Sequence, residues 1–246
     1  MGLQREFEAQ GQWLFRWRGI LPFLFTPMIA LAIADMHWPF GSARVYAIWE
    51  YACLGVSIAG LAVRIIVAVV VPAGTSGRNT KGQCATSLNT TGMYSLTRHP
   101  LYLGNYLIGL GAMMAPSVWW LPVIYSISFV AYYERIMFAE EAFLRRKFGT
   151  RFSAWARQTP AFLPAIKRWR SPALGFSVRT AMKREYTALF VVVATHGALE
   201  IAGHAVVEHR FAFETKWGFL LIAGAACYLV LRGLKKHSEL LSVSGR

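Results

Sequence analysis

Charge is scarce in this sequence. Of its 246 residues only 15% are Asp, Glu, Lys or Arg, whereas soluble domains carry about 25%. Acidic residues are the scarcest, with 12 Asp and Glu against 26 Lys and Arg and a formal net charge of +14, while 55% of the residues are apolar. This excludes an ordinary soluble domain, and the hydrophobicity excludes a disordered chain. Two classes remain: a nucleic-acid-binding protein with a large core, or a membrane protein with its cations outside the bilayer.

Cysteine is also rare, since Cys53, Cys84 and Cys227 are the three in the chain. Three scattered thiols exclude a disulfide framework and a cysteine-based metal set. No small-residue cleavage site follows the first apolar run, Gly19–Ala34, so we expect a spanning helix there and not a signal peptide. No Gly-x-Gly-x-x-Gly motif follows a strand-like run, which argues against a Rossmann domain.

Long apolar runs decide between the two classes, because a helix that crosses a bilayer needs about 20 mostly apolar residues. One interrupted run, Leu101–Phe138, is broken at Pro116 and Pro122 and is long enough for two helices in a hairpin. The other runs are Gly19–Ala34, Val45–Val71, Tyr186–Val207 and Lys216–Leu234. The sequence therefore predicts an all-α, polytopic membrane helix bundle of about six spans, the third of them short.

The cations are distributed unevenly between the expected loops. With the N-terminus in the cytoplasm, 22 Lys and Arg fall on the cytoplasmic side and three, Arg44, Arg210 and Lys216, on the other. Cytoplasmic loops of membrane proteins carry such an excess. We therefore expect both termini in the cytoplasm, no nucleic-acid partner, and basic-aromatic stretches that meet lipid headgroups.

Most polar residues without an evident structural role fall in one window. It runs from Gly92 to Asn105, resumes at Glu134-Arg135 and Glu140-Glu141, and ends with Phe148 to Pro164. Pro100 suits the first turn of a helix, so Arg98 and His99 should lie where the loop enters the third span. The fourth span should continue as a cytoplasmic helix to a stop at Gly149. If these spans form a hairpin, both charged groups meet at one membrane face in a pocket beside the bilayer.

This window resembles the integral-membrane isoprenylcysteine carboxyl methyltransferase and phospholipid methyltransferase group. The shared pattern is Gly-x-Tyr, then Arg-His-Pro-x-Tyr-x-Gly, then a Glu-Glu pair before Phe-Gly, and a Thr-Pro-x-Phe-x-Pro ending. Its members here are Gly92, Tyr94, Arg98, His99, Pro100, Tyr102, Gly104, Glu140, Glu141, Phe148, Gly149 and Thr159 to Pro164. The resemblance covers residues 45 to 170 and implies S-adenosylmethionine as the methyl donor.

The resemblance also implies roles for individual residues. The expected cofactor-binding residues are Tyr94, His99, Pro100, Tyr102, Leu103, Gly104 and Glu140. The expected catalytic residues are Arg98, Arg135 and Glu141. Carboxylates in a partly dry site would hold the cationic groups of the donor strongly. The planar guanidinium groups suit the donor's carboxylate or an anionic acceptor.

The acceptor stays open between three headgroup chemistries. A lipid phosphate fits the basic face slightly best, a prenylated-cysteine carboxylate comes next, and an amine, which carries its own cation, fits less well. Two other function classes also remain, a membrane reductase of the sterol or isoprenoid type that uses NADPH, and a non-enzymatic lipid-binding or transport protein.

Several polar residues lie in spans away from this window. His196, Glu200 and His204 stand four apart on one helix face; we expect a hydrogen-bond network between helices there, and no metal. Glu50 and Arg64 lie near span ends, where they can reach water or headgroups. The expected domains are an N-terminal interfacial segment with the first span (1–44), a methyltransferase-like core (45–170), and a further transmembrane hairpin with a basic tail (171–246).

Overall fold

The computed structural model describes residues 2–72, 74–75, 83–209, 211 and 214–245. Within these ranges every regular element is a helix and no strand occurs, which confirms the all-α expectation. Four of the counted cations, Arg78, Lys81, Arg210 and Arg246, lie outside the described residues.

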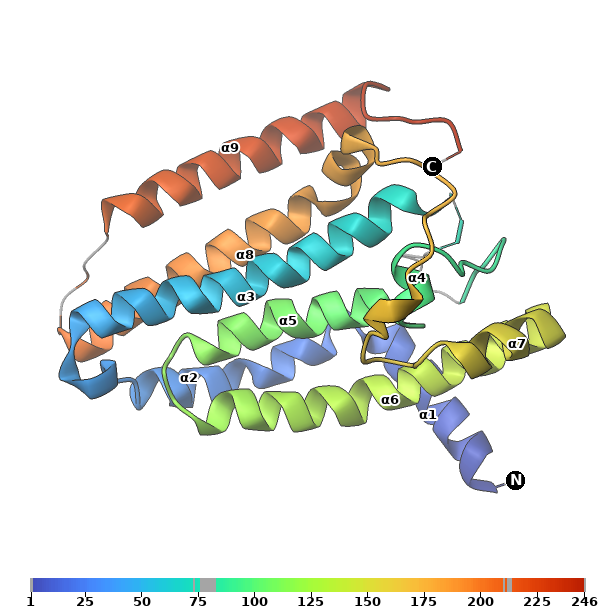
Figure 1. Cartoon of the computed structure of the whole chain (residues 1–246). Helices are drawn as coiled ribbons and strands as arrows, with labels where there is room; N and C mark the ends of the chain where they lie inside the picture. The colour runs from blue at the N-terminus through green and yellow to red at the C-terminus, as the bar shows by residue number, and fades with distance from the viewer. Residues whose placement is uncertain (1, 73, 76–82, 210, 212–213, 246) are drawn as a thin grey trace.

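Most of the long helices run along a common direction (Figure 1). The α-helices are α1 (Gly2–Trp17), α2 (Thr26–Ala34), α3 (Ala43–Val70), α4 (Met93–Leu96), α5 (Pro100–Met114), α6 (Trp120–Phe148), α7 (Thr150–Gln158), α8 (Val178–Val207) and α9 (Thr215–His237). The short 3-10 helices are η1 (Leu21–Phe25), η2 (Pro39–Gly41) and η3 (Ile166–Arg168).

Four helical segments are long and apolar enough to cross a membrane: Pro22–Gly41, Ala43–Val70, Val178–Val207 and Thr215–His237. Large apolar side chains face outward on them, among them Phe219 and Ile222 of α9, which are 73% and 74% exposed. Such exposed apolar side chains on a long helix are suited to contact with lipid. The expected hairpin is present as α5 and α6, but neither helix is among these four segments. With 15 residues, α5 is about 22 Å long, short of a hydrocarbon core of about 30 Å.

The start and end of this hairpin follow local rules. Pro100 is the first residue of α5, where its missing N–H costs no hydrogen bond. The fourth apolar run continues as one helix to Phe148 and stops at Gly149, as expected. Gly149 has a φ of +53°, a left-handed conformation that glycine adopts without strain, and its N–H donates to the Arg145 carbonyl at 2.9 Å. Thus α6 carries Glu140 and Glu141 beyond its apolar part.

Among the described helices, α3 and α5 pack against each other most extensively, and glycines make this contact possible. A Cβ at Gly60 would lie 2.6 Å from the Gly104 carbonyl oxygen, and one at Gly111 would lie 2.3 Å from the Cys53 carbonyl oxygen. Small residues let helix backbones approach in this way within membranes. Around this pair, α8 packs on α3, α9 on α8, and α1 on α6.

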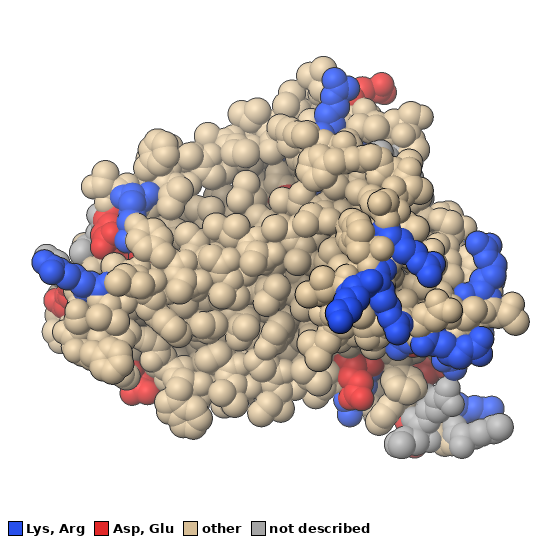
Figure 2. Space-filling view, in the orientation of Figure 1, with Lys and Arg blue, Asp and Glu red and all other residues tan. Residues whose placement is uncertain are grey.

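Charged side chains gather at the ends of the bundle. On the face shown in Figure 2, most Lys and Arg lie at the end where Figure 1 places α4 and α7, and nearly all atoms over the middle belong to uncharged residues. A smaller group of both signs lies at the opposite end. On this face the bundle therefore has an apolar middle and two polar ends.

The α3–α5 contact predicts how two glycine substitutions differ. Gly111→Ala should destabilise the protein by about 1–3 kcal/mol, because its Cβ meets helix backbone that cannot move aside. Gly55→Ala is the matched control, since a Cβ there meets nothing within 4 Å, and it should be neutral or stabilise by about 0.5–1 kcal/mol. Thermal unfolding in detergent measures both; equal stabilities would contradict the close packing.

Candidate active site

The polar window of the sequence is assembled at one end of the bundle by segments far apart in the chain. The loop before α5, the last turns of α6, and the segment after α7 meet there (Figure 1). Backbone hydrogen bonds fix them: the Arg98 N–H donates to the Pro160 carbonyl at 2.9 Å and the His99 N–H to the Ala161 carbonyl at 3.2 Å. The Thr97 hydroxyl donates to the same Ala161 carbonyl at 2.9 Å. The Thr-Pro-x-Phe-x-Pro ending therefore holds the Arg-His-Pro turn in place.

His99 lies between the two glutamates of α6. Its Nε2 is 3.1 Å from Glu141 Oε1, and its Nδ1 is 3.3 Å from Glu140 Oε2. The His99 side chain is 5% exposed, and Arg98 Nε lies 2.8 Å from the same Glu141 oxygen. The expected meeting of the Arg-His and Glu-Glu pairs is thus present in the structure. With a carboxylate at each ring nitrogen, the arrangement suits a His99 that carries both protons.

The charges of this cluster shift two pKa values in opposite directions. Burial alone would lower the pKa of the His99 imidazole, but hydrogen bonds to Glu140 and Glu141 reverse this and raise its pKa above the ordinary 6.5. For Glu141, burial acts to raise the pKa, whereas the hydrogen bond from His99 and the nearby charges of His99 and Arg98 hold it below the ordinary 4.5. At pH values between the lowered pKa of Glu141 and the raised pKa of His99, both groups are charged and form an ion pair.

Glu140 differs from Glu141 because it also faces a cavity. Its Oε2 accepts a hydrogen bond from the Tyr102 hydroxyl at 2.9 Å, and its side chain remains 31% exposed. The cavity measures about 730 Å³. Its polar and aromatic lining includes Arg18, Arg64, Tyr94, Arg98, His99, Tyr102, Asn105, Tyr133, Glu140, Trp155, Lys183, Arg184, Glu185 and Lys235. Burial raises the pKa of the Tyr94 phenol, so this hydroxyl stays protonated.

The structure does not bring all the expected site residues to this cavity. Arg135 turns toward α1, where its Nε donates to Gln10 Oε1 at 3.1 Å and its guanidinium lies 5.0 Å from the Phe7 ring centre. Glu141 lies behind His99, and Leu103 is also outside the lining. Gly104 faces α3, where an added Cβ would lie 2.6 Å from Arg64 Cγ.

The sequence analysis missed several polar residues at the cavity, and Arg64 is the one whose side chain makes the most described hydrogen bonds. Arg64 of α3 donates to both carboxylate oxygens of Glu185 on α8, at 2.9 and 3.1 Å, and also to Asn105 of α5. From the sequence, Arg64 is a cation near a span end that can reach headgroups. Its charge within a spanning helix was the available signal, because such residues are functional candidates by default.

Comparisons with known proteins concern the middle of the chain. Residues 51–151 match the family model described as phospholipid methyltransferase. The nickel-cobalt-cadmium resistance protein NccN of Alcaligenes xylosoxydans xylosoxydans is 35% identical over 132 residues, 50% of this chain and 59% of that protein. The cobalt-zinc-cadmium resistance protein CzcN of Cupriavidus metallidurans is 31% identical over 162 residues, 63% of this chain and 64% of that protein.

A third relative bears directly on the resemblance seen in the motifs. The protein-S-isoprenylcysteine O-methyltransferase of Schizosaccharomyces pombe is 28% identical over 79 residues, 32% of this chain and 34% of that protein. The chain thus spans less than two thirds of the length of each of these relatives. No solved structure matches it. The family match and this relative confirm the resemblance to the membrane methyltransferases.

The His99 cluster predicts a pH-dependent contribution to stability. Because the folded pKa of His99 is raised, its contribution is complete below pH 6.5 and is lost as the pH rises through the raised value. Because the pKa of Glu141 is lowered, its contribution is present above pH 4.5 and is lost as the pH falls through the lowered value. Wild type should therefore exceed His99→Gln in unfolding free energy most between pH 4.5 and 6.5, by about 3 kcal/mol.

Denaturant unfolding of both proteins in detergent, at a series of pH values, measures this difference. His237→Asn is the control, since that residue is exposed in the last turn of α9. A difference between wild type and His99→Gln that does not change with pH would show that His99 is not an ionised partner.

Proposed function

We propose, from the premise that residues 51–151 match the phospholipid methyltransferase family, that this chain is a membrane methyltransferase which uses S-adenosylmethionine. The acceptor is a lipid or lipid-linked headgroup with an anionic phosphate or carboxylate. The observation that carries the proposal is the placement of Glu140: a carboxylate braced by Tyr102 and His99 faces a cavity at the polar end of an otherwise apolar bundle.

The residues around the cavity suit the proposed donor in size and charge. Ligand pockets commonly measure about 300–1,000 Å³, and this cavity measures about 730 Å³. Glu140 can hold a cationic group, while Arg98 or Arg64 can meet a carboxylate. The aromatic rings of Tyr94 and Trp155 line the same space. When bound, S-adenosylmethionine supplies a methyl group on a positively charged sulfur.

The ion-pair network behind the cavity fixes the orientation of Glu140. Tyr102 and His99 both bind Oε2, which leaves Oε1 without either of these partners. In turn His99 is held by Glu141, and Glu141 by Arg98. We therefore assign Glu141 a positioning role and assign to Glu140 the direct contact with the methyl donor. A preset geometry of this kind can contribute about 7–11 kcal/mol when it aligns two reacting groups.

Cations at the cavity favour an anionic acceptor. Arg18, Lys183, Arg184 and Lys235 line it together with Arg64 and Arg98. Each Lys or Arg near an anionic lipid surface contributes about 1 kcal/mol. A phosphate or carboxylate acceptor is already an anion and needs no general base, so no proton has to leave before transfer. An amine acceptor would have to bring its own cation into this basic space.

The same reasoning gives the proposed arrangement in the membrane. We place the cavity at the cytoplasmic face because the cation-rich end of the bundle obeys the positive-inside tendency. With both termini on that side, α5 and α6 are the third and fourth of six spans, and α6 extends into the cytoplasm. Residues 45–170 then form the methyltransferase-like core, with 1–44 before it and the hairpin 171–246 after it.

Two of the relatives are named for resistance to nickel, cobalt, cadmium or zinc. We propose that the methyl acceptor of this chain be sought in membranes of cells exposed to these metals as well as in unexposed ones. A reductase or a lipid carrier remains the competing function, and ligand binding distinguishes them.

Donor binding is expected to depend on Glu140. Glu140→Gln should weaken S-adenosylmethionine binding about 10- to 100-fold, because a hydrogen bond to a charged group contributes about 1.5–3 kcal/mol. Isothermal titration of the full chain in detergent measures it. Glu134→Gln is the matched control on the same helix, since that side chain is 56% exposed. Retention of NADPH without S-adenosylmethionine binding would refute the proposal in favour of a reductase, and retention of neither in favour of a carrier.

Acceptor binding is expected to depend on the Lys and Arg side chains that line the cavity. Lys235→Gln should raise the KM for the lipid acceptor about fivefold at unchanged kcat, because one cation contributes about 1 kcal/mol. Lys236→Gln is the control, since Lys236 is exposed on the same turn and does not line the cavity.

The acceptor itself is found by incubating membranes with labelled methyl donor and identifying the methylated species by mass spectrometry. Methylation of amines alone would contradict the anionic acceptor.

A further inference from the structure

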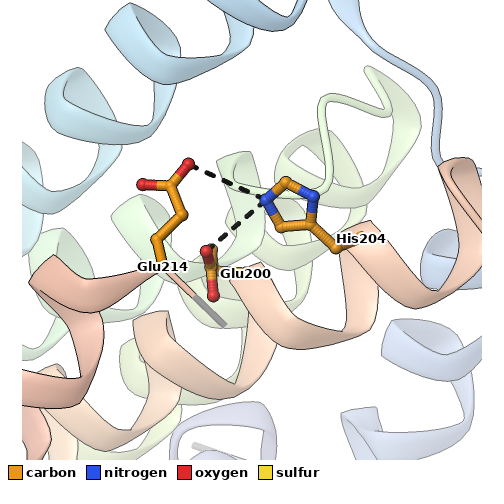
Figure 3. Close-up of side chains that lie close together, drawn as sticks. All are labelled: Glu200, His204 and Glu214. Atoms are coloured by element: carbon orange, nitrogen blue, oxygen red, sulfur yellow. Dashed lines mark ion pairs between the residues drawn. The ribbon is translucent and has the colours of Figure 1, made fainter. Parts of the chain in front are cut away.

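The opposite end of the bundle holds a second cluster of ligand-type side chains. Glu200 and His204 come from the last turns of α8, and Glu214 immediately precedes α9 (Figure 3). One ligand atom from each residue lies within 4.8 Å of the other two. Periodicity along α8 places Glu200 and His204 on one face, but Glu214 joins them only through the fold. The cluster is separated from the cavity of the proposed methyltransferase by the length of the helices (Figure 1).

Glu200 is the unusual member of this cluster. It is 1% exposed, and in the described part of the chain no side chain donates a hydrogen bond to either of its carboxylate oxygens, although the backbone N–H of Glu214 lies near them. His204 Nε2 is 3.5 Å from Glu200 Oε1 and 3.9 Å from Glu214 Oε1. A buried carboxylate without hydrogen bonds is costly, so buried charges are paired or coordinate metals. The nearby His204 is the ionisable side chain that contacts this carboxylate in the described chain (Figure 3).

His204 also has a carboxylate close to its second ring nitrogen. Its Nδ1 lies 3.0 Å from Glu208 Oε2, one helical turn further along. No hydrogen bond joins these two atoms in the described chain, but the negative charge of Glu208 favours a proton on Nδ1, and Nε2 is then the nitrogen nearest Glu200 and Glu214. In zinc sites a carboxylate at the second ring nitrogen raises the basicity of the histidine.

The nearby lysine does not neutralise Glu200. Lys216 Nζ lies 2.7 Å from Glu214 Oε2 and 2.8 Å from Glu50 Oε2. Trp217 Nε1 donates to the other oxygen of Glu50 at 2.8 Å. Glu50 is therefore satisfied, and Glu214 keeps its Oε1 toward His204. Lys216 is therefore shared by Glu50 and Glu214, and among the described residues no lysine or arginine pairs with Glu200.

The remaining histidine of the expected network has a different role. His196 Nε2 lies 3.0 Å from the Ser57 hydroxyl of α3, a buried contact between two helices. This contact is of the kind predicted from the sequence for all three residues. Glu200 and His204 make no such bond to α3 among the described contacts.

We propose that Glu200, His204 and Glu214 bind a divalent transition-metal cation of the Zn²⁺ type. One imidazole and two carboxylates form a ligand set that zinc accepts, with water in the fourth position. Metal–ligand bonds of about 2.0–2.2 Å place tetrahedral ligands about 3.4 Å apart, close to the 3.5 Å between His204 Nε2 and Glu200 Oε1. Calcium and magnesium prefer more oxygen ligands and no imidazole. The site does not depend on the proposed methyl transfer.

Titration of the chelator-treated full chain in detergent with ZnCl₂ tests the proposal. We expect one saturable Zn²⁺ per chain and no displacement by equimolar Mg²⁺ or Ca²⁺. Co²⁺ added to the metal-free chain should show the visible absorption of a four-coordinate site, and Zn²⁺ should displace it. Glu200→Gln and Glu214→Gln should each weaken binding at least tenfold, and His204→Asn should abolish it. Glu208→Gln should weaken it about 10- to 100-fold, because it removes the carboxylate that raises the basicity of the histidine.

Controls separate this site from adventitious binding and from loss of folding. A Cys84→Ser, Cys227→Ser background removes two exposed thiols, and Glu239→Gln changes a carboxylate at the other end of the bundle; both should bind as wild type does. Zn²⁺ should raise the Tm of wild type but not of His204→Asn. If that variant does not fold, Glu214→Gln, at a 45% exposed side chain, gives the same comparison. No saturable binding, or binding unchanged in all three ligand variants, would overturn the proposal and leave a histidine held by carboxylates.

Discussion

The candidate site depends on giving a nearly buried imidazole two partners of opposite charge. His99 meets this constraint, because a carboxylate lies at each of its ring nitrogens and Arg98 balances one of them. Without these partners a nearly buried imidazolium would lose its proton. These charges join the loop before α5 to the end of α6, and backbone hydrogen bonds to Pro160 and Ala161 join the same loop to the segment after α7.

The glycine contact between α3 and α5 sets where that network lies. Because Gly60 and Gly104 let the two backbones approach, Arg64 passes close to α5 and reaches Asn105, while its guanidinium also binds Glu185 of α8. A larger residue at Gly104 would push Arg64 aside. Gly104 therefore serves the site through packing, which differs from the direct cofactor contact that the motif implies.

The two ends of the bundle differ in how their buried charged side chains are paired. At the proposed methyltransferase end, the buried histidine and its glutamates have described partners, and one carboxylate faces a cavity. At the other end, Glu200 is buried and no side chain of the described chain donates a hydrogen bond to either of its oxygens. A satisfied network stabilises a geometry, whereas an unsatisfied carboxylate favours binding of a cation. The length of the helices keeps these two chemistries apart.

The sequence by itself determined the helical class, the long apolar segments, the stop at Gly149, and the meeting of Arg98 and His99 with Glu140 and Glu141. Each of these follows from local periodicity, capping chemistry or one hairpin. Only the tertiary structure decided which charges share a space. It turned Arg135 toward α1, placed Arg64 beside the cavity, set Glu141 behind His99, and brought Glu214 to His204. The reason is physical: side-chain direction on a helix follows from sequence, but the neighbour that it meets depends on how separate helices pack.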